Sequence, residues 1–351
     1  MLFGYPIEAT AENWFHECLV EILETIHANP QQNFIWPDII PLQYRERLSG
    51  RTGLRARLIA YQEAISSLGS NELNQVSNAL IEQNEIADLL ACRCNCETLD
   101  ELPLAIQQPL KSLFEFGFKI LTDLGIRDQH YQVIYNTTAI HVCPFCGCEY
   151  FDAPGAPREA LDHYLAESKY TFAATNLKNL APMGNKCNSK YKLAQNILYD
   201  DNGTRRRSYY PYDQPGRVQI SLDRSEPFAG TQKLFPLPHW EIDFNPTTEE
   251  ILTWNSVFRI DERYKRDILD ADFMNWLREF SAWCRSGNLR LDSEQDVINA
   301  LDRYAGFMQA MGFRDRAFLK TAVFQMLRQH CENGNGRLIT LIQGVVVGGM
   351  A

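Results

Sequence analysis

The stretch "LDHYLAESKYTFAATNLKNLAPMGNKCNSKYK", residues 161–192, decides the fold at the centre of this chain. In its first five residues, Leu161, His163 and Leu165 alternate with Asp162 and Tyr164, which predicts a short strand that carries Asp162 and His163. A second strand is expected within residues 176–183. The segment "CNSKYKLAQNIL" predicts a helix whose first turn carries Asn188. The sequence therefore predicts a strand–strand–helix unit with polar residues at the ends of its elements.

A cysteine knuckle precedes this unit in "HVCPFCGC", residues 141–148, where Cys143 and Cys146 form a Cys-x-x-Cys pair. The start of the chain lacks the features of a secretory signal, and no run of about 18 apolar residues could span a bilayer. We therefore expect a cytoplasmic protein with no membrane partner and with its ten cysteines reduced. Closely spaced cysteines in such a chain are first considered as ligands of structural Zn²⁺.

The second half of this zinc site is incomplete. Cys187 follows Cys146 by 41 residues, and a four-cysteine site would have its mate at position 184, where the sequence has Gly184. Cys148 and His141 each lie two residues from a knuckle cysteine and could complete the tetrahedron, and we favour Cys148. Two alternatives stay open: three thiolates with a water, and thiols that pack as apolar residues without zinc.

Helical periodicity dominates the rest of the chain, from residue 12 to about residue 123 and again in residues 273–331. Residues 131–135 and the apolar end of the chain from Leu338 predict strands. Residues 200–246 are rich in Pro and Gly and predict loops with short strands. We expect an α+β fold, mostly helical with a small mixed centre. The expected parts are an N-terminal helical region (1–128), a central module (129–212) and a C-terminal, mainly helical region (213–351).

Charge is distributed unevenly along the chain. The formal net charge of −10 argues against a protein that is coated by nucleic acid or lies on anionic lipid. Residues 158–207, however, hold nine Lys/Arg against five Asp/Glu, a local excess of +4 that leaves −14 for the remainder. Contacts with nucleic acid are therefore expected in the centre.

The order Asp-His, asparagine, and Cys-Asn at a helix start, inside a Cys-x-x-Cys frame, resembles the HNH endonucleases, whose nuclease centre is a ββα-metal module. The resemblance covers residues 141–199. It implies roles for four residues: His163 as general base, Asp162 and Asn188 as ligands of a catalytic Mg²⁺ or Mn²⁺ ion, and Asn179 as the residue that orients the base. The family has a second Cys-x-x-Cys pair followed by Asn or His, and Gly184 departs from that pattern.

The chemistry gives independent reasons for these residue types. An imidazole with an unperturbed pKa of about 6.5 can take a proton from water near neutral pH. One carboxylate and one amide oxygen suit a hard cation that stabilises the leaving 3′ oxygen. Asn176 competes with Asn179 for the orienting role, and the spacing to Cys187 favours Asn179.

Five cations near the centre are candidates for phosphate contacts. Lys192 lies four residues after Asn188 and is expected on the same helix face. Three consecutive arginines precede "SYYPY", and this combination of cations and aromatic rings suits a loop that contacts phosphate, with an interdomain salt-bridge patch as the alternative. The candidates are Lys190, Lys192, Arg205, Arg206 and Arg207.

These patterns predict an enzyme, an endonuclease that hydrolyses phosphodiester bonds of nucleic acid, with DNA as the expected substrate. The arrangement also resembles, through "WNSVFRIDERYKRDIL" after the centre, nuclease subunits of bacterial anti-phage systems such as Septu and some retron-linked nucleases. That resemblance implies antiviral defence beside an ATPase partner. The alternative is a non-catalytic zinc-knuckle subunit that binds nucleic acid or protein. Such a binder has no use for a base beside two oxygen ligands.

Overall fold

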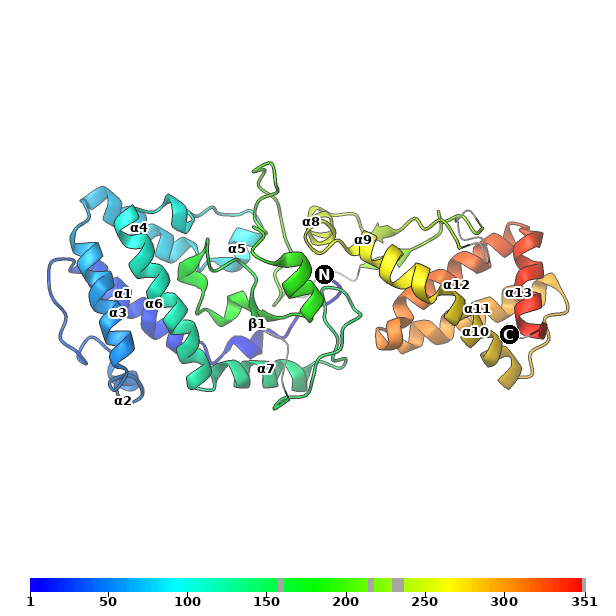
Figure 1. Cartoon of the computed structure of the whole chain (residues 1–351), viewed down its shortest axis with the longest axis horizontal. Coiled ribbons are helices and arrows are strands. Elements are labelled where there is room, and N and C mark those ends of the chain that lie inside the picture. The colour runs from blue at the N-terminus through cyan, green and yellow to red at the C-terminus, as the bar shows by residue number, and fades with distance from the viewer. Residues whose placement is uncertain (157–160, 214–217, 229–236, 349–351) are drawn as a thin grey trace. The chain divides into compact units, whose positions relative to one another are not determined.

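The computed structural model describes residues 1–156, 161–213, 218–228 and 237–348. Within these ranges the chain is mostly helical and has two small antiparallel sheets, so the expected α+β class is confirmed (Figure 1). The chain divides into two compact units, and each is described by itself. The first comprises Met1–Phe145, Glu149–Gly216 and Glu249–Val257; the second comprises Cys146–Cys148, Arg217–Thr248 and Phe258–Ala351.

The first unit is built mainly from helices. The longest is α6, which packs along α3, and α1 contacts both α3 and α4 (Figure 1). Each of these helices has apolar residues every three or four positions, so each presents one apolar stripe to the others. The helices are α1 (Trp14–Ala28), α2 (Arg45–Leu48), α3 (Thr52–Ser66), α4 (Ser70–Glu82), α5 (Ile86–Leu90), α6 (Leu104–Asp123), α7 (Ile126–Thr137) and α8 (Glu249–Phe258).

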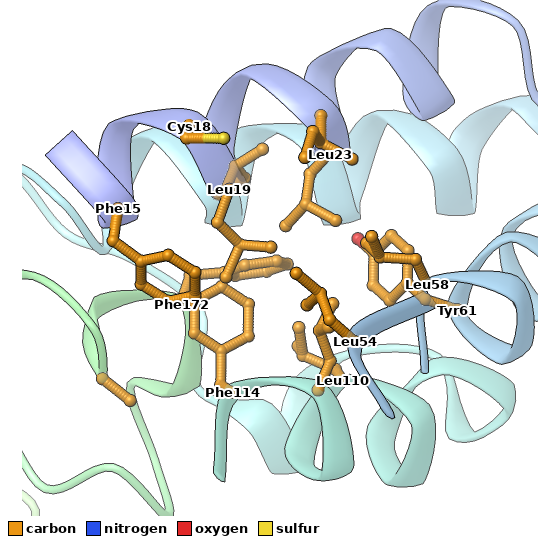
Figure 2. Close-up of a cluster of buried hydrophobic side chains, with 14 of the residues drawn as sticks. Phe15, Cys18, Leu19, Leu23, Leu54, Leu58, Tyr61, Leu110, Phe114 and Phe172 are labelled. Atoms are coloured by element: carbon orange, nitrogen blue, oxygen red, sulfur yellow. The ribbon is translucent and has the colours of Figure 1, made fainter. Parts of the chain in front are cut away.

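The apolar stripes meet in one core that reaches into the central segment. Figure 2 shows Leu19 and Leu23 of α1, and Leu54 of α3, pointing into this core. Phe114 of α6 meets Phe172 edge to face, with ring centroids 5.7 Å apart. Phe172 belongs to the segment that links the two central strands, so the N-terminal helices and the central strands share one hydrophobic core.

Residues 131–135 are helical, and the expectation of a strand there is wrong. They belong to α7, in which Tyr131 and Ile134 are buried. Tyr131 and Tyr135 are four residues apart, and their ring centroids lie 6.1 Å from each other on the helix surface. Three aromatic or β-branched residues at alternating positions suggested a strand, but the run is shorter than the helix that contains it.

The two central strands are present as a hairpin. β1 (Leu161–His163) pairs antiparallel with β2 (Leu180–Pro182), so that Asp162 lies opposite Ala181 and His163 opposite Leu180. β2 is shorter than expected because a 3-10 turn, Leu177–Asn179, precedes it. The expected helix is only a six-residue π-helical turn, Cys187–Lys192.

The second unit combines a small sheet with a helical bundle. β3 (Gln219–Ser221) and β4 (Asp243–Asn245) pair antiparallel in the Pro/Gly-rich region, where short strands were expected. The bundle core is aromatic: the Phe280 ring lies 5.3 Å from those of both Tyr304 and Phe324. Its helices are α9 (Ile260–Arg263), α10 (Asp270–Ser286), α11 (Glu294–Met311), α12 (Ala317–Glu332) and α13 (Gly336–Gly348).

The C-terminal apolar segment forms α13, and the expectation of a buried strand there is wrong. Leu338, Ile342, Val345 and Val346 are buried on one side of this helix, at the spacing that a helix face requires. β-branched residues suggested a strand, but packing of the apolar stripe against α10 and α12 decided the outcome. Across the described ranges, every helix falls short of the length and apolarity that a bilayer crossing requires.

Candidate active site

His163 ends β1 and is buried, with 8% of its surface exposed. Its Nε2 lies 2.8 Å from the carbonyl oxygen of Ala174, and its ring packs on Phe118 with centroids 4.5 Å apart. A carbonyl oxygen only accepts hydrogen bonds, so Nε2 carries the proton and Nδ1 has the lone pair. Burial lowers the pKa of His163 to about 4, which keeps the ring neutral at pH 7.

Glu167 is the acid nearest to the other side of this imidazole. Its Oε2 lies 3.5 Å from Nδ1 of His163, a distance at which a proton on Nδ1 would gain an electrostatic partner. Burial raises the pKa of Glu167, and the neighbouring carboxylates Glu115 and Asp162 act in the same direction. The imidazole therefore has one fixed nitrogen, held by a backbone carbonyl, and one nitrogen beside an acid.

Asp162 forms an ion pair with Lys192. The ammonium of Lys192 lies 2.8 Å from Oδ2 of Asp162 and donates a hydrogen bond of 2.6 Å to the carbonyl oxygen of His163. Burial raises the pKa of Asp162, and Lys192 opposes that shift. Sequence reasoning assigned Lys192 to a phosphate, whereas in the structure it is buried, 1% exposed, and neutralises the carboxylate of the hairpin.

Asn179 is fully buried and ties the hairpin loop together. Its Oδ1 accepts a 2.7 Å hydrogen bond from the amide of Leu165, and its Nδ2 donates to the carbonyl of Leu165 at 3.0 Å and to that of Ala173 at 3.3 Å. These bonds fix the backbone two residues beyond His163 and next to Ala174, whose carbonyl holds the imidazole. Asn176 has a different place, since its Oδ1 accepts from the amide of Lys178 and caps the 3-10 turn.

Asn188 lies in the π-helical turn and is partly exposed. Its backbone amide donates to the carbonyl of Gly184 at 3.0 Å, and its carbonyl accepts from the amide of Leu193 at 3.0 Å. The same turn ends with Lys192, which reaches Asp162. The structure thus joins Asp162, His163 and Lys192 through direct contacts, while Asn188 is linked to them through the turn.

Three of the four predicted zinc ligands come together. The sulfur atoms of Cys143, Cys146 and Cys187 lie within 4.8 Å of one another, and all three residues are buried. Zinc–sulfur bonds of about 2.3 Å place tetrahedral thiolates roughly 3.8 Å apart, so this cluster is compatible with a bound metal ion. The backbone amide of Cys143 donates to the carbonyl of Glu149 at 2.8 Å and closes the knuckle.

The two candidates for the fourth ligand lie outside this group of sulfurs. The thiol of Cys148 contacts the carbonyl oxygen of Cys146 at 3.1 Å. His141 places Nε2 2.9 Å from the carbonyl oxygen of Tyr135 and stacks on that ring at 3.6 Å. The preference for Cys148 is therefore not reproduced in this geometry.

The predicted phosphate-contacting arginines differ in exposure. Arg205 donates to the carbonyls of Leu89 and Leu198, and Arg206 donates to that of Ile197 at 3.1 Å, so both are tied to backbone of the first unit. Arg207 is exposed, with Nε 3.8 Å from a carboxylate oxygen of Glu249. Lys190 is exposed on the π-helical turn. Of the five candidates, Lys190 and Arg207 are the two most open to solvent.

Sequence reasoning missed two contacts of the site: the bond from His163 to the carbonyl of Ala174, and the ion pair between Lys192 and Asp162. The carbonyl of Ala174 gives no sequence signal, because any residue could supply it. The role of Lys192 had a signal, since a buried carboxylate requires a counter-charge and the turn holds few cations. Comparison of the chain with protein families, with curated proteins and with solved structures gave no match.

Proposed function

We propose that this protein is a metal-dependent endonuclease of the HNH type, which hydrolyses phosphodiester bonds of nucleic acid and acts on DNA. The observation that carries the proposal is the state of His163. Its Nε2 is held by the carbonyl of Ala174 at 2.8 Å, and burial lowers its pKa to about 4, so Nδ1 is an unprotonated base at neutral pH. A general base must present such a lone pair in a fixed direction.

In the proposed reaction, Nδ1 of His163 takes a proton from water while the water oxygen attacks phosphorus and the bond to the 3′ oxygen breaks. The bond from Nε2 to Ala174 keeps the ring in place as it becomes positive. Glu167, 3.5 Å from Nδ1, stabilises that positive charge. Asn179 holds the loop around the base by its bonds to Leu165 and Ala173, and so acts as a positioning residue.

Asp162 and Asn188 are the proposed ligands of Mg²⁺ or Mn²⁺. Such an ion would stabilise negative charge on the leaving oxygen. The ammonium of Lys192 lies 2.8 Å from Asp162, which supports the proposal that this carboxylate faces a cation. In the nuclease, a divalent ion would replace Lys192 as the counter-charge of Asp162. Structural Zn²⁺ at Cys143, Cys146 and Cys187 is part of the same proposal.

The biological setting we propose is antiviral defence beside an ATPase subunit. The acidic remainder of the chain, −14 outside residues 158–207, supports a protein partner rather than nucleic acid as its neighbour. The exposed Lys190 and Arg207 are the proposed phosphate contacts.

The ion pair between Asp162 and Lys192 favours a second candidate, a non-catalytic subunit that binds nucleic acid or protein. In that protein the lysine would be the permanent partner of the carboxylate, and the hairpin would serve only as scaffold.

Nicking of supercoiled plasmid in the presence of Mg²⁺ or Mn²⁺, by the chain alone and together with the products of its neighbouring genes, separates the two candidates. Wild type should nick, and His163→Ala and His163→Asn should lower the rate by about 10²–10⁴-fold, the range for loss of a general base. His163→Asn retains an amide that can donate to Ala174 and guards against misfolding. The control is His239→Ala, because His239 is exposed. A wild type that binds DNA but cuts in neither setting would establish the binding subunit instead.

A further inference from the structure

The side chain of Glu149 occupies the space next to Gly184 that the Cβ atom of a cysteine at this position would need. A Cβ atom built on Gly184 would lie 2.5 Å from Oε2, 2.7 Å from Cδ and 2.8 Å from Cβ of Glu149. These distances are shorter than real Cβ contacts, so a side chain at position 184 would require Glu149 to move from its present position. Glu149 therefore lies at the place of the first cysteine of the second Cys-x-x-Cys pair.

The turn that carries Cys187 also holds the Glu149 carboxylate. Its Oε1 accepts a 3.0 Å hydrogen bond from the backbone amide of Lys186, the residue just before Cys187. This hydrogen bond keeps the Glu149 carboxylate beside the turn that carries Cys187. At the other end, the carbonyl of Glu149 accepts from the amide of Cys143, so the residue is bonded to both halves of the cysteine frame.

We infer that Glu149 is the fourth ligand of the metal ion at Cys143, Cys146 and Cys187, in place of the cysteine that Gly184 replaces. The inference rests on the zinc part of the proposed function. The carboxylate oxygens lie outside the sulfur group of 4.8 Å, so ligation requires the side chain to rotate inward from the position that it takes beside Gly184. Zinc accepts Asp or Glu oxygen at about 2.0–2.2 Å beside thiolate sulfur.

The chemistry of this ligand set has a measurable consequence. Three thiolates and a carboxylate give zinc the same formal charge as four thiolates, so the electrostatic balance of the site is kept. A carboxylate is a harder donor than a thiolate, and zinc prefers the softer one. The ion is therefore held less tightly here than in a four-cysteine frame, and a sulfur ligand at the same place should tighten it.

X-ray absorption at the zinc edge of the full-length protein tests the inference. Wild type should show three sulfur neighbours at about 2.3 Å and one oxygen at about 2.0–2.2 Å. Glu149→Cys should show four sulfurs, and so should the double variant Gly184→Cys with Glu149→Gly, which removes the whole contacting side chain, Cβ included. Glu149→Gln keeps an acceptor for the Lys186 amide. It should lose its zinc at a chelator concentration at least about tenfold lower than wild type requires.

Cys148→Ser is the matched control and should leave both the sulfur count and the chelator titration unchanged. A four-sulfur wild type, a sulfur count that falls in Cys148→Ser, a Glu149→Gln that retains zinc like wild type, or a wild type that takes up no zinc would each overturn the inference. Plasmid nicking is read separately. If wild type nicks plasmid but its zinc has no oxygen neighbour from Glu149, only this inference is refuted. If the zinc has three sulfurs and one oxygen but the protein does not nick, only the nuclease proposal is refuted.

Discussion

The hairpin Leu161–Pro182 and the turn Cys187–Lys192 hold buried polar groups in opposite ways. In the hairpin, Asn179 and His163 are satisfied by backbone carbonyls and amides of the same segment, so their positions follow from the chain itself. The turn brings Cys187 to two other cysteines and Lys192 to Asp162, so each of its buried groups depends on a partner from elsewhere. Self-contained hydrogen bonding fixes geometry without a ligand, whereas the turn needs a counter-charge or a metal ion.

The largest effect should come from the lysine that connects the two regions. Lys192→Met leaves the buried Oδ2 of Asp162 without a cation and should lower the free energy of unfolding by about 3–5 kcal/mol at pH 8, measured by urea denaturation. Adding Asp162→Asn should recover most of that loss. Arg93→Met removes the cation from the exposed pair with Asp88, and should cost less than about 1 kcal/mol. Equal costs for the two pairs would contradict the view that Lys192 is structurally required.

A somewhat smaller effect is expected inside the hairpin. Asn179→Ala removes three hydrogen bonds from a fully buried amide and strands the backbone groups of Leu165, and should lower the free energy of unfolding by about 3 kcal/mol. The same variant should lose nicking activity even where it remains folded, since the loop beyond His163 is released. The control is Asn71→Ala on α4, an exposed asparagine, which should stay within about 0.5 kcal/mol of wild type. A hairpin that tolerates Asn179→Ala would show that its geometry is set by the core alone.

The smallest expected effect is the pH dependence of the buried imidazole. His163 has its pKa lowered to about 4, mainly by burial, with Lys192 and Arg127 acting in the same direction. Between pH 6.5 and 4 the unfolded chain therefore binds more protons than the folded one at this residue, and the free energy of unfolding falls as pH falls through that window. The share of His163 is at most about 3 kcal/mol.

Replacement of the titrating ring checks this assignment. His163→Asn should gain stability relative to wild type as pH is lowered from 7 to 4, in urea titrations at several pH values. Other histidines with lowered pKa, among them His16, His27 and His130, titrate in both proteins and cancel in the difference. His239→Asn, at an exposed position, is the control for a histidine-to-asparagine exchange and should stay within about 0.5 kcal/mol of wild type at pH 7. A constant difference between His163→Asn and wild type would mean that the ring is not the group that titrates.

The hydrophobic pattern of the sequence was sufficient to predict several of the secondary-structure elements. The alternation around Asp162 predicted β1, and the helical stripes of α1, α6, α10 and α12 appear at the predicted spacing. The pattern failed in α7 and α13, where β-branched and aromatic residues suggested strands. In both segments the apolar residues also fit a helical spacing, and packing against neighbouring helices selected the helix.

The candidate site was predictable in its residue types and not in its pairings. His163, Asp162 and Asn179 were named from the resemblance to HNH endonucleases, and three of the cysteines from their spacing. The structure brings the cysteines within 4.8 Å and the hairpin residues into one bonded segment. Sequence reasoning assigned Lys192 to a phosphate because helical spacing was assumed for a segment that forms a short π-helical turn. Which cation meets a buried carboxylate depends on distance in space, and spacing cannot supply it.

The sequence by itself determined the helical majority and the short hairpin, since both follow from the periodicity of adjacent residues, and it offered the candidate site residues through their donor types. Only the tertiary structure decided that Nε2 of His163 is bonded to Ala174, that Lys192 neutralises Asp162, and that Glu149 occupies the place of a side chain at Gly184. These are contacts between groups that are 11, 30 and 35 residues apart in the sequence, so they depend on how the chain folds back on itself.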